Sequence, residues 1–109
     1  MSLYQVQFSY TAEAWAKLAR NPEDRSAEVG ALLESLGGRL LSFYYYIGGE
    51  YDGVLILEAP DKEAALAATI SAFAAGGAKA LNTTELVSVE EGMEAMRRAG
   101  EQAFRAPGE

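Results

Sequence analysis

The feature that most constrains the fold is a pair of strand-like segments joined by a short glycine-rich loop. Residues 39–47 and 51–59 are rich in aliphatic and aromatic side chains, and Gly48-Gly49-Glu50 separates them. Two such segments around a short loop with glycine are typical of a β-hairpin. Large apolar side chains lie on both faces of this hairpin. We therefore expect both faces of its sheet to be covered.

Segments on either side of the hairpin complete a β-α-β-β-α-β order. Residues 3–10 and 79–89 read as strands, the first by its strict alternation. A short helical turn capped by Thr11 follows the first strand. Longer helices are predicted over residues 22–36 and 62–75. The order predicts a ferredoxin-like α+β fold, in which one four-stranded antiparallel sheet carries helices on one face.

Capping residues and apolar stripes place the two longer helices. Asn21 is expected to cap the helix over residues 22–36, and Asp61 the helix over residues 62–75. Each helix has apolar residues at helical spacing, and we expect each stripe to face the sheet. The stripes are Val29, Leu32, Leu33 and Leu36 on the first helix and Leu66, Ile70 and Phe73 on the second.

The chain has the length of one domain. Its 109 residues allow one hydrophobic core, so we expect a single ferredoxin-like domain over residues 1–109. Ser88 and Glu91 fit a capping box, which predicts a C-terminal helix over residues 90–105. Residues 106–109 are then expected to form a loose tail.

The composition excludes several kinds of chemistry. The sequence has no cysteine and no histidine, which rules out disulfides, cysteine-bound clusters and the commonest metal ligand. We expect no cofactor and no metal. The net charge of −7 disfavours nucleic acid and anionic membranes as partners. No apolar stretch approaches the roughly 20 residues of a membrane span, and no export signal is recognisable, so a cytoplasmic location is expected.

The hairpin, with large apolar side chains on both faces, predicts a homodimer. In strict alternation, Leu41, Phe43, Tyr45 and Ile47 oppose Leu40, Tyr44 and Tyr46. One of these sets must face away from the helices, and an apolar patch of that size marks an interaction surface. A second copy related by a twofold axis is the simplest cover, and an edge strand would allow higher oligomers. The alternative is that the C-terminal helix folds across the open face.

Several short motifs resemble the GYD domain family, over about residues 3–89. The most specific is the hairpin turn Gly49-Glu50-Tyr51-Asp52, which differs by the inserted Glu50 from the Gly-Tyr-Asp that the family name echoes. The resemblance implies a ferredoxin-like fold of the dimeric α/β-barrel group, in which two sheets face each other with helices outside. It implies little about chemistry. The other matching segments are Ser42–Tyr44, Tyr4–Thr11, Leu36–Gly38 and Glu58–Asp61.

The turn pair Tyr51-Asp52 is a candidate site with two interpretations. As a ligand site, the phenol and the carboxylate would lie at the mouth of a pocket and make polar contacts. As a structural turn, Asp52 would accept hydrogen bonds from nearby backbone amides, which aspartates in turns often do. The sequence favours the structural interpretation.

Tyr44 and Tyr46 share one strand face, and Tyr45 lies on the other. The first two are candidates for the wall of an aromatic cavity, because phenols offer an apolar body and a polar tip. Packing in the core or in an interface is the alternative. Gln7 belongs with Gln5, Ser9 and Ser42 to a set of polar residues in a sheet that is otherwise expected to be buried on both faces. These residues would be either specificity groups in a pocket or a water-filled seam.

Three further residues complete the candidate list. Asn82, in the last strand, is a candidate for orienting a carbonyl group or an oxygen adduct. Glu58 ends a strand, where burial would make it a general base and exposure would leave it structural. Trp15, on the short helix, is expected to be a lid over the core.

Three functional hypotheses follow. The first is a homodimeric module that binds a small, partly apolar ligand, such as an aromatic molecule, in a cavity between sheet and helices. The second is a cofactor-independent monooxygenase or isomerase of the dimeric-barrel type, using Tyr44 or Tyr46, Asn82, and Asp52 or Glu58. The third is a purely structural association domain. The sequence contains no recognisable catalytic constellation, which favours the first.

Overall fold

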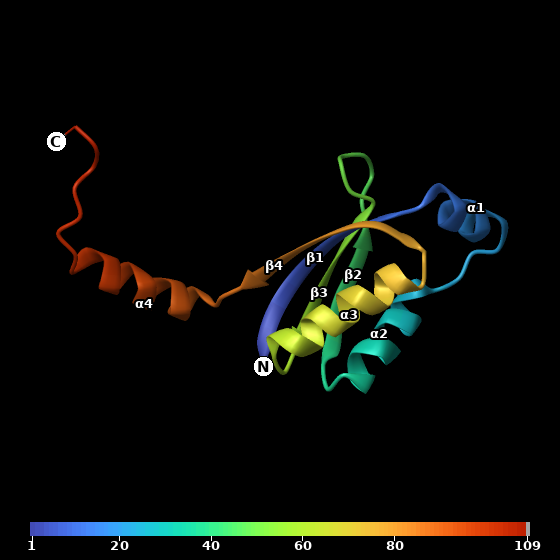
Figure 1. Ribbon diagram of the computed structural model, residues 1–109, viewed down its shortest axis with the longest axis horizontal. Coiled ribbons are helices and arrows are strands. Elements are labelled where there is room, and N and C mark those ends of the chain that lie inside the picture. Colours follow the sequence, from blue (N-terminus) through green and yellow to red (C-terminus); the bar gives the residue numbers. More distant parts are fainter. Residues whose placement is uncertain (109) are drawn as a thin grey trace.

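The computed structural model describes residues 1–108 and has eight regular elements in the predicted order (Figure 1). The elements are β1 (Ser2–Tyr10), α1 (Ala12–Arg20), α2 (Arg25–Ser35), β2 (Arg39–Tyr45), β3 (Gly53–Ala59), α3 (Lys62–Ala74), β4 (Ala78–Leu86) and α4 (Val89–Gly100). The helical turn predicted after the first strand is a full helix, α1. The predicted C-terminal helix, α4, follows the last strand.

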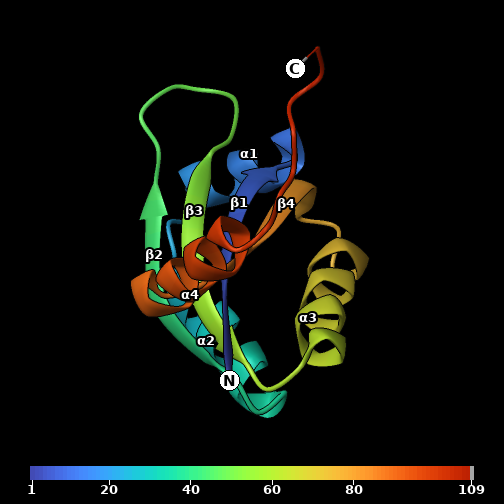
Figure 2. The same ribbon diagram turned by 90° about the vertical axis from the view of Figure 1, so that its left-hand side faces the viewer.

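The four strands form one open sheet in the order β2-β3-β1-β4, and each neighbouring pair is antiparallel. Helices α2 and α3 lie on the same face of this sheet, α2 next to β2 and α3 next to β4 (Figures 1 and 2). Within residues 1–108, no helix packs over the opposite face, which we call the open face. The ferredoxin-like α+β fold predicted from the sequence is confirmed.

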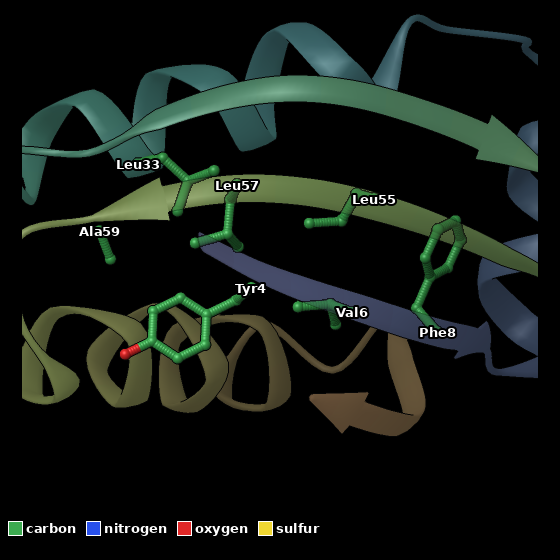
Figure 3. Close-up of a cluster of buried hydrophobic side chains, with 7 residues drawn as sticks. All are labelled: Tyr4, Val6, Phe8, Leu33, Leu55, Leu57 and Ala59. Atoms are coloured by element: carbon green, nitrogen blue, oxygen red, sulfur yellow. The ribbon is translucent and has the colours of Figure 1, made fainter. Parts of the chain in front are cut away.

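The core lies between the two central strands and the helices (Figure 3). In the register of β1 and β3, Tyr4 is opposite Leu57 and Val6 is opposite Leu55, so alternate residues of both strands share one face. Leu33 of α2 packs on this face and is 2% exposed, which confirms the stripe predicted for that helix. The buried residues are Tyr4, Val6, Phe8, Leu33, Leu55, Leu57 and Ala59.

The stripe predicted for α3 is wrong, because it points away from the sheet. Leu66, Ile70 and Phe73 are 59%, 57% and 45% exposed, whereas Ala65 and Ala68 pack against the core. Two stripes run along this helix, one of large apolar side chains and one of alanines. Helical spacing alone does not decide which faces inward, and here the small one does.

A β-bulge overturns the predicted alternation in β2. The register shifts between Leu40 and Ser42, so Leu40 lies opposite Leu57 on the same face as Phe43. Leu41 is the extra residue and is 43% exposed. A bulge places two residues opposite one, which reverses the faces on one side of it. The prediction that Leu41 shares a face with Phe43 is therefore wrong.

Some helix ends also differ from prediction. Asn21 caps the end of α1 rather than the start of α2. The Asp24 side chain accepts from the backbone N–H of Ser26 at 3.0 Å and caps α2 instead, so the helix starts later. The capping box of Ser88 with Glu91 is confirmed.

The C-terminal helix is shorter than predicted. It ends at Gly100, whereas the sequence predicted a helix over residues 90–105. Residues 106–108 of the predicted tail 106–109 are not helical, and residue 109 lies outside the described residues.

Helix α4 projects away from the rest of the molecule (Figure 1). The extents are 59 × 34 × 21 Å, and the radius of gyration is 17.7 Å against about 13 Å for a compact domain of this length. Val89, Met93 and Met96 lie on one stripe of α4 and remain exposed. The helix therefore does not fold across the open face. None of the helices in residues 1–108 has the length and apolar character needed to cross a membrane.

Candidate functional site

A cavity of about 610 Å³ lies between the sheet and helices α1, α2 and α3. Protein interiors are normally packed with few voids larger than a water molecule. Small-molecule sites occupy roughly 300–1,000 Å³ and are mostly apolar, with a few polar groups. The cavity has these properties. Its apolar lining includes Val29, Leu32, Leu33, Leu55, Leu57 and Phe43.

The orientation of α3 creates this space. Ala65 and Ala68 line the cavity, and both are alanines on the inward stripe of the helix. Had the large stripe faced the sheet, the leucine, isoleucine and phenylalanine side chains would have filled the same volume. The alanines therefore leave room without breaking the helix, because alanine has the highest helix propensity of all residues.

An aromatic cluster lies at one side of the cavity. Its members come from β1, α1 and β2, and neighbouring ring centroids are 5.1–6.2 Å apart, within the range of favourable aromatic contacts. Tyr10 lines the cavity, and its hydroxyl lies 3.1 Å from the hydroxyl of Tyr45. The members are Phe8, Tyr10, Trp15, Phe43 and Tyr45.

Burial raises the pKa of the Tyr10 phenol well above its ordinary value, and the contact with Tyr45 raises it further. The nearby Arg25 guanidinium acts in the opposite direction and is the weaker influence. Tyr10 therefore stays a neutral phenol throughout the physiological pH range. At the cavity wall it offers a hydroxyl that both donates and accepts hydrogen bonds.

Tyr10→Phe is expected to reduce the loss of stability at alkaline pH. With a raised folded-state pKa, the unfolded chain loses its phenolic proton first, above about pH 10. The unfolded state then binds fewer protons, so the free energy of unfolding falls as pH rises. Urea unfolding between pH 8 and 11 should show a shallower decline in the variant. Equal declines in the two proteins would contradict the assignment to Tyr10.

Asp52 ties the hairpin turn to the end of β1 and to α1. Its Oδ2 accepts from the backbone N–H of Tyr10 and from Nε1 of Trp15, each at 2.9 Å. Its backbone N–H donates to the Phe8 carbonyl at 2.8 Å, and its carbonyl accepts from the Tyr46 N–H. The carboxylate is thus engaged in holding three elements together, as the structural interpretation of the turn expects.

Asp52→Ala is expected to lower the free energy of unfolding by about 1–3 kcal/mol. The substitution leaves the Tyr10 amide and the Trp15 indole without their charged acceptor. Glu50→Ala, at an exposed position of the same turn, is the matched control and should change stability by less than about 0.5 kcal/mol. Chemical denaturation of both variants is the measurement. Equal stability of the two would show that the turn does not depend on the Asp52 contacts.

The close packing around the first residue of β3 explains why it is a glycine, Gly53. A Cβ at this position would collide with the Phe8 ring and with the carbonyl oxygen of Tyr44. Only glycine fits between these groups, which fixes the residue after Tyr51-Asp52. Tyr51 itself is half-buried in the turn.

Four other predicted site residues lie on the open face, away from the cavity. Tyr46 accepts through its hydroxyl from Nε2 of Gln7 at 3.3 Å, and Asn82 donates from Nδ2 to Oε1 of Gln7 at 3.0 Å. These three side chains form a polar row across the face. Tyr44 is 66% exposed on the same face, opposite Val54 of β3. None of the four lines the cavity.

Glu58 and Trp15 have structural partners. Glu58 forms an ion pair with Arg39 of the neighbouring strand at 3.3 Å. Trp15 covers the aromatic cluster rather than the centre of the core, and it is 40% exposed. In residues 1–108, aspartate and glutamate side chains nowhere gather in a group able to hold a metal ion.

The sequence interpretation missed the residues that line the cavity. Neither the alanines Ala65 and Ala68 nor the charged residues Lys17, Arg20 and Arg25 were among the predicted site residues. The sequence does contain a row of alanines in residues 62–75, but helical spacing alone does not show that this row faces the sheet and leaves unfilled volume there.

Comparison with known proteins agrees with this fold. The family model described as GYD domain matches residues 4–96. Among solved structures, MtbAldR (Rv2779c) aligns with a TM-score of 0.53 at 14% identity, covering 97% of this chain and 58% of that one. The chain thus spans little more than half the length of MtbAldR, and at this identity the likeness concerns the fold alone.

A second solved structure is an uncharacterized NIPSNAP domain protein from Burkholderia xenovorans. It aligns with a TM-score of 0.48 at 14% identity, covering 82% of this chain and 95% of that one. No curated protein matches the sequence.

Proposed function

The chain belongs to the GYD domain family, and for this member we propose the function of a homodimeric module that binds a small, partly apolar molecule. The ligand occupies the cavity between the sheet and the helices. The observation that carries this proposal is the 610 Å³ space lined by leucine, valine and alanine side chains, with Tyr10 as a hydrogen-bonding group at its wall. Aromatic molecules with one polar group match such a lining.

Two surfaces that lack a packing partner within residues 1–108 support the homodimer. The open face carries the apolar side chains of Leu3, Val54 and Ile56 on the central strands, and α4 carries an exposed stripe. A second copy with its open face against the first would bury both central patches, as expected for an isologous contact. The projecting α4 would then reach along the partner. In this arrangement the polar row of Tyr46, Gln7 and Asn82 serves the contact between sheets.

The test of ligand binding is a titration with 2-naphthol, a neutral aromatic alcohol. Isothermal titration calorimetry should give one molecule bound per chain. Amide chemical-shift changes should centre on Val29, Leu33 and Ala68, which line the cavity. Residues of the open face, such as Ile56, should keep their shifts.

Two results would contradict the proposal. Shift changes centred on Ile56 and Tyr44 would place the ligand between the sheets instead. A complete absence of binding, in a protein that sediments as a dimer, would leave the association domain as the function.

A further inference from the structure

The charges around the cavity are unlike those of the chain as a whole. Lys17, Arg20 and Arg25 line it, together with a single carboxylate, Glu23. The chain has 9 basic and 16 acidic residues, so one third of its cations and one sixteenth of its carboxylates are at this site. A cavity in a protein of net charge −7 thus carries a local excess of positive charge.

These cations lie at one side of the cavity because they are close in the sequence. Lys17 and Arg20 belong to the last turn of α1, and Arg25 is the first residue of α2. Arg25 is paired with Glu23 at 2.8 Å. Neither Lys17 nor Arg20 has a carboxylate within ion-pair distance in residues 1–108. The excess positive charge therefore comes from the side chains of Lys17 and Arg20 on α1.

We propose that the ligand is an amphipathic anion, an apolar or aromatic body bearing a carboxylate or a similar negative group. This inference rests on the proposed function, since it names the chemical class of the same ligand. The body lies between Leu33 and Leu57, and the negative group lies toward Lys17, Arg20 and Arg25. The neutral Tyr10 hydroxyl, near Arg25, is an additional hydrogen-bond donor on that side.

A purely structural role for Lys17 and Arg20 makes a different prediction. Cations in the last turn of a helix stabilise it through the helix dipole. Their removal would then lower stability to the same extent whichever ligand is present. It would leave the preference between charged and neutral ligands unchanged.

The experiment compares 2-naphthoate with 2-naphthamide, which share one ring system and differ in charge. At low ionic strength, the carboxylate should bind about three- to tenfold more tightly, the size expected for partly exposed ion pairs. Added salt should reduce this ratio. In the double variant Lys17→Gln with Arg20→Gln, the ratio should fall close to one while the affinity for the amide stays unchanged.

The matched control is the double variant Lys62→Gln with Lys79→Gln, two cations that do not line the cavity. It changes the net charge equally and should keep the wild-type ratio. Equal or tighter binding of the amide by the native protein would overturn the anionic class and leave the cavity as a ligand site. An equal loss of preference in the control would also overturn it. Binding of neither compound would overturn both proposals.

Discussion

Ala68→Leu is expected to weaken 2-naphthol binding by about tenfold or more while the protein stays folded. Ala68 lies on the inward stripe of α3 and lines the cavity. A leucine at this position extends into the volume that the ligand would occupy. Filling a cavity commonly stabilises a protein, so the free energy of unfolding should rise or stay the same. A tenfold loss of affinity corresponds to about 1.4 kcal/mol.

The matched control is Ala31→Leu, on α2 at an exposed position that does not line the cavity. It should leave the affinity unchanged, and calorimetric titration of both variants is the measurement. Undiminished binding by Ala68→Leu, with a cooperative unfolding transition, would show that the ligand lies elsewhere.

Ile56→Asp is expected to convert the proposed dimer into a monomer. Ile56 lies on β3, a central strand, on the open face opposite Gln5 of β1. In a twofold contact each substitution acts in both copies, so two carboxylates would be buried near each other. Burying an unpaired charge costs far more than a typical interface side chain contributes. Sedimentation velocity at a concentration where the native protein is dimeric should therefore show the monomer mass.

Leu66→Asp is the control for this substitution, since Leu66 is exposed on the outer side of α3. It introduces the same charge and should leave the dimer intact. Circular dichroism should show native secondary structure for both variants. A native protein that sediments as a monomer, or an Ile56→Asp variant that remains a dimer, would contradict the proposed sheet-to-sheet contact.

The sequence predicted the fold correctly where a hydrophobic pattern was compatible with only one local structure. The alternation in residues 3–10 and the hairpin with its glycine loop correctly predicted three of the four strands. The prediction failed where a pattern was compatible with two arrangements. On α3, a large and a small stripe were both compatible with helical spacing, and only packing against the sheet selects between them. In β2, the bulge at Leu41 reversed the alternation on one side of it, and nothing in the local sequence marks a bulge.

The candidate site was less predictable than the fold. The sequence pattern favoured aromatic and amide side chains as cavity residues, yet Tyr44, Tyr46, Gln7 and Asn82 lie on the open face. Cavities are made by small residues, which carry no chemical signal of their own. Only the tertiary arrangement shows that Ala65 and Ala68 face Leu57 across an unfilled space.

The most direct test of the central claim is a crystal structure of the protein with 2-naphthol. We expect electron density for the naphthalene ring between Leu33 of α2 and Leu57 of β3, in each copy of a dimer whose open faces meet. Density between the sheets, or a cavity closed by the surrounding side chains with no ligand in it, would contradict the account.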